Sequence, residues 1–187
     1  MIEKLAKFIS IILNPIFAGT ALLFYLIFFK EKLDIYQLGF ITFLIFVPIV
    51  FIVYLLRRKI VKDLDISDVH KRKYFYFPTF GFLLITLPLL YILRIPTSIT
   101  LFEIGFTIWI FCWAIISLFY KISGHTGGAS FVYGLAYFLI GGKLWFYILL
   151  LIILAWSRVK LKQHTVLQTI LGTILGFLIS VFVFKII

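Results

Sequence analysis

The sequence predicts an all-α protein, a polytopic transmembrane helical bundle of six to seven membrane helices that forms a single domain over residues 1–187. Composition is the first reason. Hydrophobic residues make up 64% and charged residues 13% of the chain, whereas a soluble domain is about half apolar and about a quarter charged. A core of this chain length could not bury so much apolar surface away from water. The second reason is a series of apolar runs of membrane-crossing length, so bilayer lipid is the expected solvent.

Five apolar runs have about the 20 residues that an α-helix needs to cross the hydrocarbon layer. The first is expected to be a retained span and not a signal peptide, because its apolar part is too long and no convincing cleavage site follows it. Turns are expected at Lys30–Asp34 and Pro96–Ser98. The predicted spans are Phe8–Phe29, Gln37–Leu56, Tyr74–Leu93, Ile99–Tyr120 and His164–Ile187.

Two shorter apolar runs, Thr126–Ile140 and Leu144–Trp156, are joined by Gly141 and Gly142. Their length is compatible with two short spans and also with a hairpin that enters the membrane and returns. Both alternatives bring the ends of the pair back to the same membrane face.

Basic residues are unevenly distributed over the two predicted faces. The chain has 18 Lys and Arg, 7 Asp and Glu, and a net charge of +11. In a membrane protein these charges lie in loops, so anionic lipid headgroups or phosphates are the expected partners and not nucleic acid. One face receives Lys30, Lys32, Arg94, Lys143 and Lys185; the other receives Lys4, Lys7, Arg57, Arg58, Lys59, Lys62, Lys71, Arg72, Lys73, Lys121, Arg158, Lys160 and Lys162.

All three histidines, His70, His125 and His164, fall on the more basic face. A histidine there can simply be a polar residue where polar residues are tolerated. Arginine, lysine and histidine without paired carboxylates are nevertheless better suited to a phosphate than to a metal, because a guanidinium holds two phosphate oxygens at once. One histidine can attack phosphorus while a second protonates the leaving oxygen.

Two motifs on this face carry a family resemblance. Ser123-Gly124-His125, a helical hairpin, and then Ser157-Arg158-x5-His164 resemble the type 2 phosphatidic acid phosphatase superfamily of lipid phosphatases and vanadium haloperoxidases, and within it a variant group of small prokaryotic members. That superfamily has Pro-Ser-Gly-His as its second motif and Ser-Arg-x5-His-x3-Asp as its third. The resemblance extends from about residue 65 to the C-terminus.

The resemblance implies a role for each matching residue, and it implies no metal and no other cofactor. His164 is the expected nucleophile, which becomes a phosphohistidine, and His125 is the expected acid. The residues expected to bind the phosphoryl group are Ser123, Gly124, Arg158, Arg72 in place of the first-motif arginine, and Lys121 in place of its lysine.

Three departures from the family pattern stand out. Ile122 replaces the proline of the second motif, and Gln168 replaces the aspartate of the third. The first motif, Lys-x6-Arg-Pro, is absent in its usual form, and Asp68-x3-Arg72 is the nearest equivalent. Because Gln168 follows His164 by one helical turn, its carbonyl is expected to accept the imidazole N–H and to orient the ring.

The last predicted span carries a stripe of small and polar residues with a period of four. Gly172 and Gly176 form the small-x3-small pattern that lets membrane helices approach closely. The stripe therefore predicts that His164 faces other helices and not lipid. The stripe is His164, Gln168, Gly172, Gly176 and Ser180, and its expected partner is the small-residue segment Gly127, Gly128, Ala129, Ser130 and Gly134.

The expected function is hydrolysis of a phosphomonoester or pyrophosphate on a lipid by a multi-pass protein of the cell membrane. Polyprenyl pyrophosphate, phosphatidylglycerophosphate-like lipids and phosphatidic acid are the candidate substrates, and the oligomeric state stays open. The alternative is a non-catalytic protein of the same fold that binds anionic lipid. A transporter is disfavoured on the expectation that no charged residue lies in mid-span. The excess of Lys and Arg predicts a cytoplasmic site, whereas many members of the resembled superfamily act on the opposite face.

Overall fold

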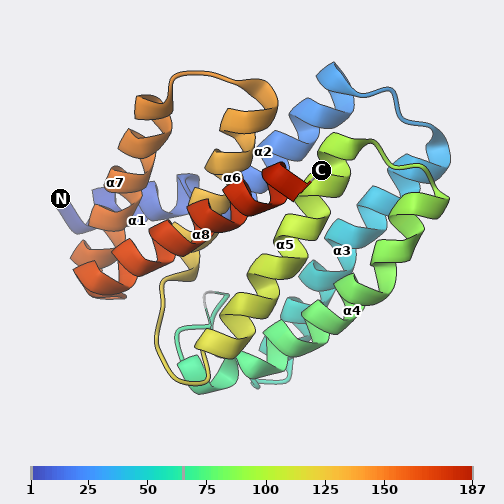
Figure 1. The fold of residues 1–187 in the computed structure, drawn as a ribbon. Coiled ribbons are helices and arrows are strands. Elements are labelled where there is room, and N and C mark those ends of the chain that lie inside the picture. The colour runs from blue at the N-terminus through green and yellow to red at the C-terminus, as the bar shows by residue number, and fades with distance from the viewer. Residues whose placement is uncertain (1, 65, 187) are drawn as a thin grey trace. The chain divides into compact units, whose positions relative to one another are not determined.

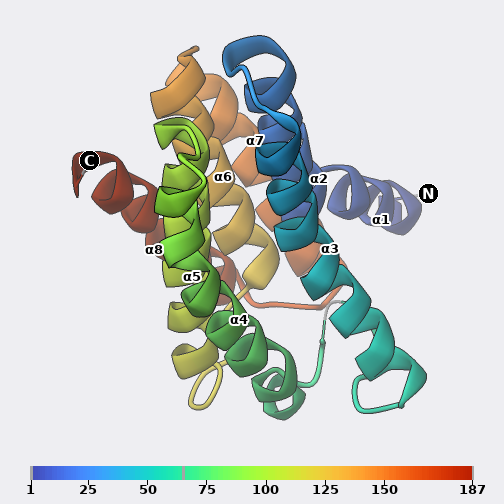
Figure 2. The same cartoon turned by 90° about the vertical axis from the view of Figure 1, so that its right-hand side faces the viewer.

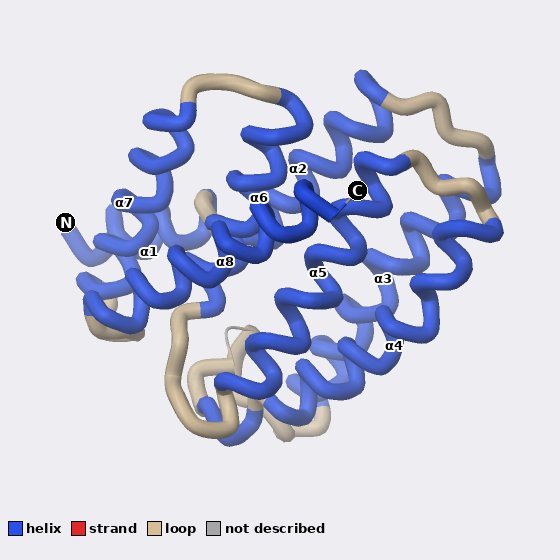
Figure 3. The backbone as a smooth tube through the Cα atoms, in the orientation of Figure 1, coloured by secondary structure: helices blue, strands red, loops and turns tan. Residues whose placement is uncertain are grey.

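The computed structural model describes residues 2–64 and 66–186, and these residues form helices joined by loops, without a strand among them (Figures 1 and 3). The all-α fold is therefore confirmed. The helices are α1 (Ile2–Ile12), α2 (Pro15–Tyr25), the π-helical turn η1 (Leu26–Lys30), α3 (Ile35–Arg57), the 3-10 turn η2 (Val69–Lys71), α4 (Lys73–Ile92), α5 (Thr97–Ile116), α6 (Gly124–Ile140), α7 (Leu144–Lys160) and α8 (Val166–Ile186).

Helices long and apolar enough to cross a membrane coincide with the predicted spans. Both criteria are met by Ile2–Lys30 taken as one segment across the junction of α1 and α2, and by Ile35–Arg57, Val69–Ile92, Thr97–Ile116 and Val166–Ile186. The protein is accordingly an α-helical membrane protein. Helices α6 and α7, which contain the two shorter apolar runs, have 17 residues each, which is about the lower limit for a spanning helix.

The chain divides into two compact units, and the second is inserted in the sequence of the first. The first combines the residues up to Leu26 with those from Lys121 onward, and the second is Ile27–Tyr120. The first unit contains α1, α2, α6, α7 and α8, and the second contains η1, α3, η2, α4 and α5.

In the first unit, the expectation of one continuous first helix is wrong. Helix α1 ends at Ile12, and α2 begins at Pro15. Pro15 is the first residue of α2, a position where proline's missing N–H costs nothing, and the Asn14 side chain caps the helix by accepting from the Ile16 N–H at 2.8 Å. Figure 2 shows α1 turned across the direction of α2.

Helices α6 and α8 pack against each other over most of their lengths, which confirms the predicted contact between two stripes of small residues. A Cβ added to Gly176 would overlap the carbonyl oxygen of Gly127, and one added to Gly172 would lie 2.7 Å from the carbonyl oxygen of Ser123. The Ser130 hydroxyl also donates to the Thr173 carbonyl at 2.7 Å. Glycine therefore allows the two backbones to approach closely.

The turn between α6 and α7 depends on its two glycines. Gly141 has a φ of 88° and Gly142 a φ of 109°, and residues with a Cβ rarely adopt these angles. The Tyr147 hydroxyl donates to the Gly141 carbonyl at 3.0 Å and ties α7 to the turn.

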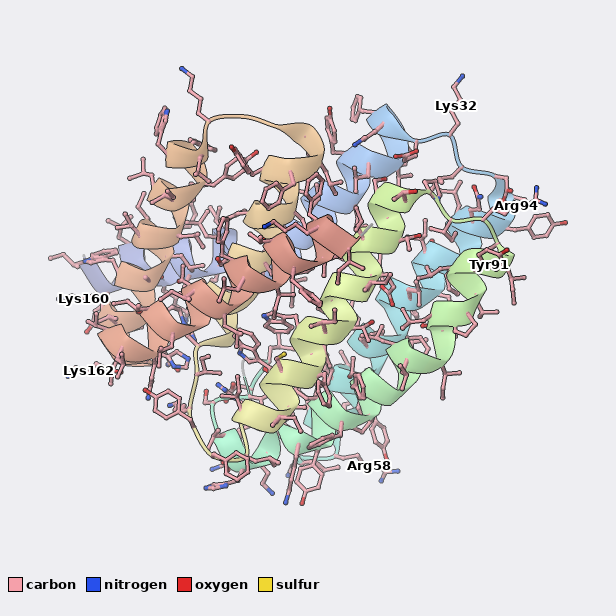
Figure 4. All side chains as sticks on the ribbon, in the orientation of Figure 1. Lys32, Arg58, Tyr91, Arg94, Lys160 and Lys162 are labelled. Carbon is pink, nitrogen blue, oxygen red and sulfur yellow. The ribbon has the colours of Figure 1, made fainter. Side chains whose placement is uncertain are left out.

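In the second unit, the loops that precede α3 and follow α4 meet at one end. Asp34 and Gln37 form a capping box at the start of α3, and Gln37 Nε2 also donates to the carbonyls of Leu93 and Arg94 at 3.0 Å. Figure 4 shows Lys32 and Arg94 at this end of the unit and Arg58 at the other. Within this unit, the predicted separation of the basic loops onto two ends is confirmed.

Candidate functional site

The two predicted motifs meet where α6 and α8 begin. The Ser123 N–H donates to the Gln168 carbonyl at 3.3 Å, and the Thr126 hydroxyl donates to the Thr169 carbonyl at 3.0 Å. Ser123 is fully buried, and its hydroxyl caps α6 by accepting from the Thr126 N–H at 3.4 Å. This arrangement holds the segments that carry His125 and His164 next to each other.

His164 lies in the turn that precedes α8 and not within the helix as expected. The helix begins at Val166 because Thr165 caps it. The Thr165 hydroxyl accepts from the Gln168 N–H at 3.3 Å, and the Gln168 amide oxygen accepts from the Thr165 N–H at 3.1 Å. Together these two bonds form a capping box, a common way to start a helix.

The predicted contact between Gln168 and His164 is confirmed. His164 Nδ1 lies 3.1 Å from Gln168 Oε1, and the histidine is 8% exposed. Because Oε1 also accepts from the Thr165 N–H, this atom is the oxygen of the amide, and it can interact with Nδ1 only as an acceptor. In neutral His164 the proton therefore lies on Nδ1, and Nε2 carries the lone pair.

The imidazole of His125 is oriented by a residue that the sequence did not single out. Its Nε2 lies 3.1 Å from Nδ2 of Asn14. Because the Asn14 oxygen accepts from the Ile16 N–H, the amide nitrogen is the atom that faces His125, and it can only donate. In the neutral form of His125 the proton therefore lies on Nδ1.

Arg158 is held inside the protein at the end of α7. It is 4% exposed, and its Nη1 donates to the Ser10 hydroxyl of α1 at 2.7 Å. Charge-assisted hydrogen bonds of this kind fix the direction of a guanidinium. The neighbouring Ser157 uses its hydroxyl within the helix, where it donates to the Leu154 carbonyl at 2.7 Å.

Gly124 and Lys121 also belong to this unit. Gly124 is the first residue of α6, where backbone N–H groups have no partner within the helix and favour an anion. Lys121 lies in the loop before Ser123 and is half-buried.

Arg72 belongs to the second unit. It lies between η2 and the first residue of α4, and its Nε donates to the Ile66 carbonyl at 3.1 Å, which fixes the guanidinium to its own loop. His70 is in the same loop and is exposed. The role of Arg72 as the first-motif arginine stays a prediction.

The excess of positive charge in the first unit favours the binding of an anion. Glu3 is the one acidic residue in its sequence, and it is exposed at the start of α1. The same segments carry the basic residues Lys4, Lys7, Lys121, Lys143, Arg158, Lys160, Lys162 and Lys185. A buried arginine in a unit with this charge excess raises the local potential, which attracts anions.

The sequence does not indicate Asn14 and Ser10 as site residues, because the first apolar run predicts one uninterrupted span. The dipeptide Asn14-Pro15 was the available signal, since such pairs mark turns and helix starts.

The expectation that no charged residue lies in mid-span is also wrong. Glu103 lies inside α5, is 6% exposed, and its Oε1 has no hydrogen-bond partner among residues 2–64 and 66–186.

Comparison with family models, with curated proteins and with solved structures gives no match for this chain.

Proposed function

We propose that this protein is a lipid phosphate phosphatase that hydrolyses a phosphomonoester or a pyrophosphate of a membrane lipid through a phosphohistidine. The observation that carries the proposal is the meeting of the starts of α6 and α8, joined by the Ser123–Gln168 hydrogen bond at 3.3 Å. This contact brings together two segments that each carry a histidine held by a side-chain amide.

The tautomer of His164 suits nucleophilic attack. With the Nδ1 proton directed at Gln168, the Nε2 lone pair attacks phosphorus, and an N–P bond forms while the P–O bond to the leaving group breaks. Protonated His125 gives a proton to the departing oxygen. Water then attacks the phosphohistidine and passes a proton to His125. Phosphate leaves, and both histidines return to their starting protonation states.

Arg158 and the start of α6 are proposed to bind the phosphoryl oxygens. The guanidinium supplies fixed donors with a positive charge, and the Gly124 amide adds a donor at a helix N-terminus. Lys121 contributes a second charge from the preceding loop. The lipid tail remains in the bilayer or among the apolar helices, so the headgroup alone enters the polar site.

The test is phosphate release by the purified protein from phosphatidic acid, a phosphatidylglycerophosphate-like lipid and a polyprenyl pyrophosphate. The assay is run with and without a metal chelator. We expect turnover of at least one substrate, loss of turnover in His164→Ala, and wild-type rates in His70→Ala, which removes an exposed histidine of the second unit. Binding of these lipids without turnover of any of them would instead support the non-catalytic alternative.

A further inference from the structure

We propose that Asn14, at the break between α1 and α2, is a positioning residue that fixes the tautomer and the ring orientation of His125. The contact is between Asn14 Nδ2 and His125 Nε2 at 3.1 Å, across 111 positions of sequence. The role in turnover rests on the proposed function, whereas the effect on the tautomer does not.

The orientation of the Asn14 amide is set by a second bond. Its oxygen accepts from the Ile16 N–H at 2.8 Å and thereby caps α2. The amide nitrogen is then directed at His125, and an amide nitrogen has hydrogens to donate but no lone pair to offer. Turning the amide over would place its NH2 group against the Ile16 N–H and remove the cap.

The consequence for His125 is an assignment of its two ring nitrogens. Nε2 accepts from Asn14, so in the neutral ring the proton is on Nδ1. With Nε2 occupied by Asn14, Nδ1 is the nitrogen that exchanges a proton with the leaving oxygen and with water. The break in the first membrane segment is therefore a functional feature, because a continuous helix would bond the backbone of residue 14 internally and would need no capping side chain there.

Two substitutions separate this role from helix capping. Asn14→Ser keeps a good N-cap residue, but its side chain is too short to reach the imidazole. Asn14→Asp keeps the cap through one carboxylate oxygen and directs the other at Nε2 as an acceptor, so it favours a proton on Nε2. Asp34→Ser is the matched control, because Asp34 caps α3 through its side chain in the same way.

The first measurement is the ¹⁵N spectrum of the histidine rings, with the His125 signals identified by their absence from His125→Ala. We expect the neutral wild-type ring to be protonated on Nδ1 and the Asn14→Asp ring on Nε2. A wild-type ring protonated on Nε2, or identical His125 spectra in wild type and Asn14→Asp, would overturn the assignment. This measurement requires no turnover, so it stands even if no lipid phosphate is hydrolysed.

The second measurement is kinetic. Asn14→Ser should lower kcat about tenfold or more, because a misplacement of a reacting group by about 1 Å can cost about 100-fold in rate, while KM stays near the wild-type value. Asp34→Ser should leave both constants unchanged. An active wild type whose kcat is unaffected by Asn14→Ser would overturn the role in proton transfer, whatever the ring spectra show.

Discussion

The imidazole Nδ1 of His164 lies 3.1 Å from the side-chain oxygen of Gln168. The same oxygen accepts from the Thr165 N–H and closes the capping box of α8. One amide therefore starts the last helix and sets the tautomer of the histidine that precedes it. The acceptor beside the ring is thus a neutral amide and not a carboxylate.

Gln168→Glu should preserve the fold and move the acidic limb of the pH–rate profile to higher pH. Glutamate is also a capping-box residue at this position, so α8 should start at the same place. The added carboxylate stabilises the imidazolium and raises the pKa of His164. Because the nucleophile must be neutral, activity then appears only at higher pH. The measurement is phosphate release across the pH range, and an identical profile in the two proteins would show that residue 168 does not influence His164.

His164→Ala should abolish turnover and leave the protein folded. The residue precedes α8, and the capping box of Thr165 and Gln168 does not need the imidazole. His125→Ala should be nearly as damaging for substrates with poor leaving groups, because these depend most on the proton from the acid. Rates for His164→Ala within about threefold of wild type would rule out covalent catalysis by this residue. Thermal unfolding in detergent checks the fold.

Gly176→Ala should destabilise the protein by about 1–3 kcal/mol, the usual cost of inserting a methyl group into a well-packed contact. The new Cβ would overlap the Gly127 carbonyl oxygen, so α6 and α8 would have to move apart. Gly81→Ala in α4 is the control, since nothing lies within 4 Å of its Cβ position, and alanine favours a helix by up to about 1 kcal/mol over glycine. Equal thermal unfolding midpoints for the two variants would contradict the close approach of α6 and α8.

Ser10→Ala should raise KM for the lipid phosphate several-fold and change kcat little. The Ser10 hydroxyl accepts from Arg158 Nη1 at 2.7 Å, so its loss leaves the guanidinium that we propose to bind phosphate less well oriented. Ser10→Thr keeps a hydroxyl and should restore most of the affinity. Steady-state kinetics in lipid–detergent micelles measure both constants. The same KM in Ser10→Ala as in wild type would show that the α1 contact does not influence substrate binding.

The features predicted from the sequence are those that depend on composition and on helical periodicity. Apolar run lengths predict α3, α4, α5 and α8 closely, and the period-four glycines predict the contact with α6 because small residues at that spacing share one helix face. The spacing of four also predicted the contact between Gln168 and His164, although His164 lies before the helix and the capping box of Thr165 and Gln168 makes the contact.

The features that could not be predicted come from pairings between segments far apart in the chain. Asn14 reaches His125 across 111 positions, and Ser10 reaches Arg158 across 148. No local pattern indicates these contacts, because they depend on how α1 and α2 pack on α6 and α7. Both contacts depend on the break between α1 and α2. The dipeptide Asn14-Pro15 indicates this break, but the apolar residues on either side of it predict one continuous span.

The last prediction concerns the membrane face of Lys160, which lies at the end of α7 (Figure 4). Arg158 is in the same helical turn, so the face of Lys160 is also the face of the site. Short loops rich in Lys and Arg remain in the cytoplasm. In the first unit, Lys121 and Arg158 are proposed to bind phosphate, but Lys160 and Lys162 have no such proposed role. We therefore expect a cytoplasmic site. A cysteine at position 160, after Cys112→Ser removes the native cysteine, should resist a membrane-impermeant thiol reagent in intact cells and react after permeabilisation.

The control is Lys143→Cys, just before α7. It should react in intact cells because a 17-residue helix is about long enough to reach the other face. Labelling at position 160 in intact cells would reverse the orientation and favour substrates presented on the outer leaflet, such as spent polyprenyl pyrophosphate carriers.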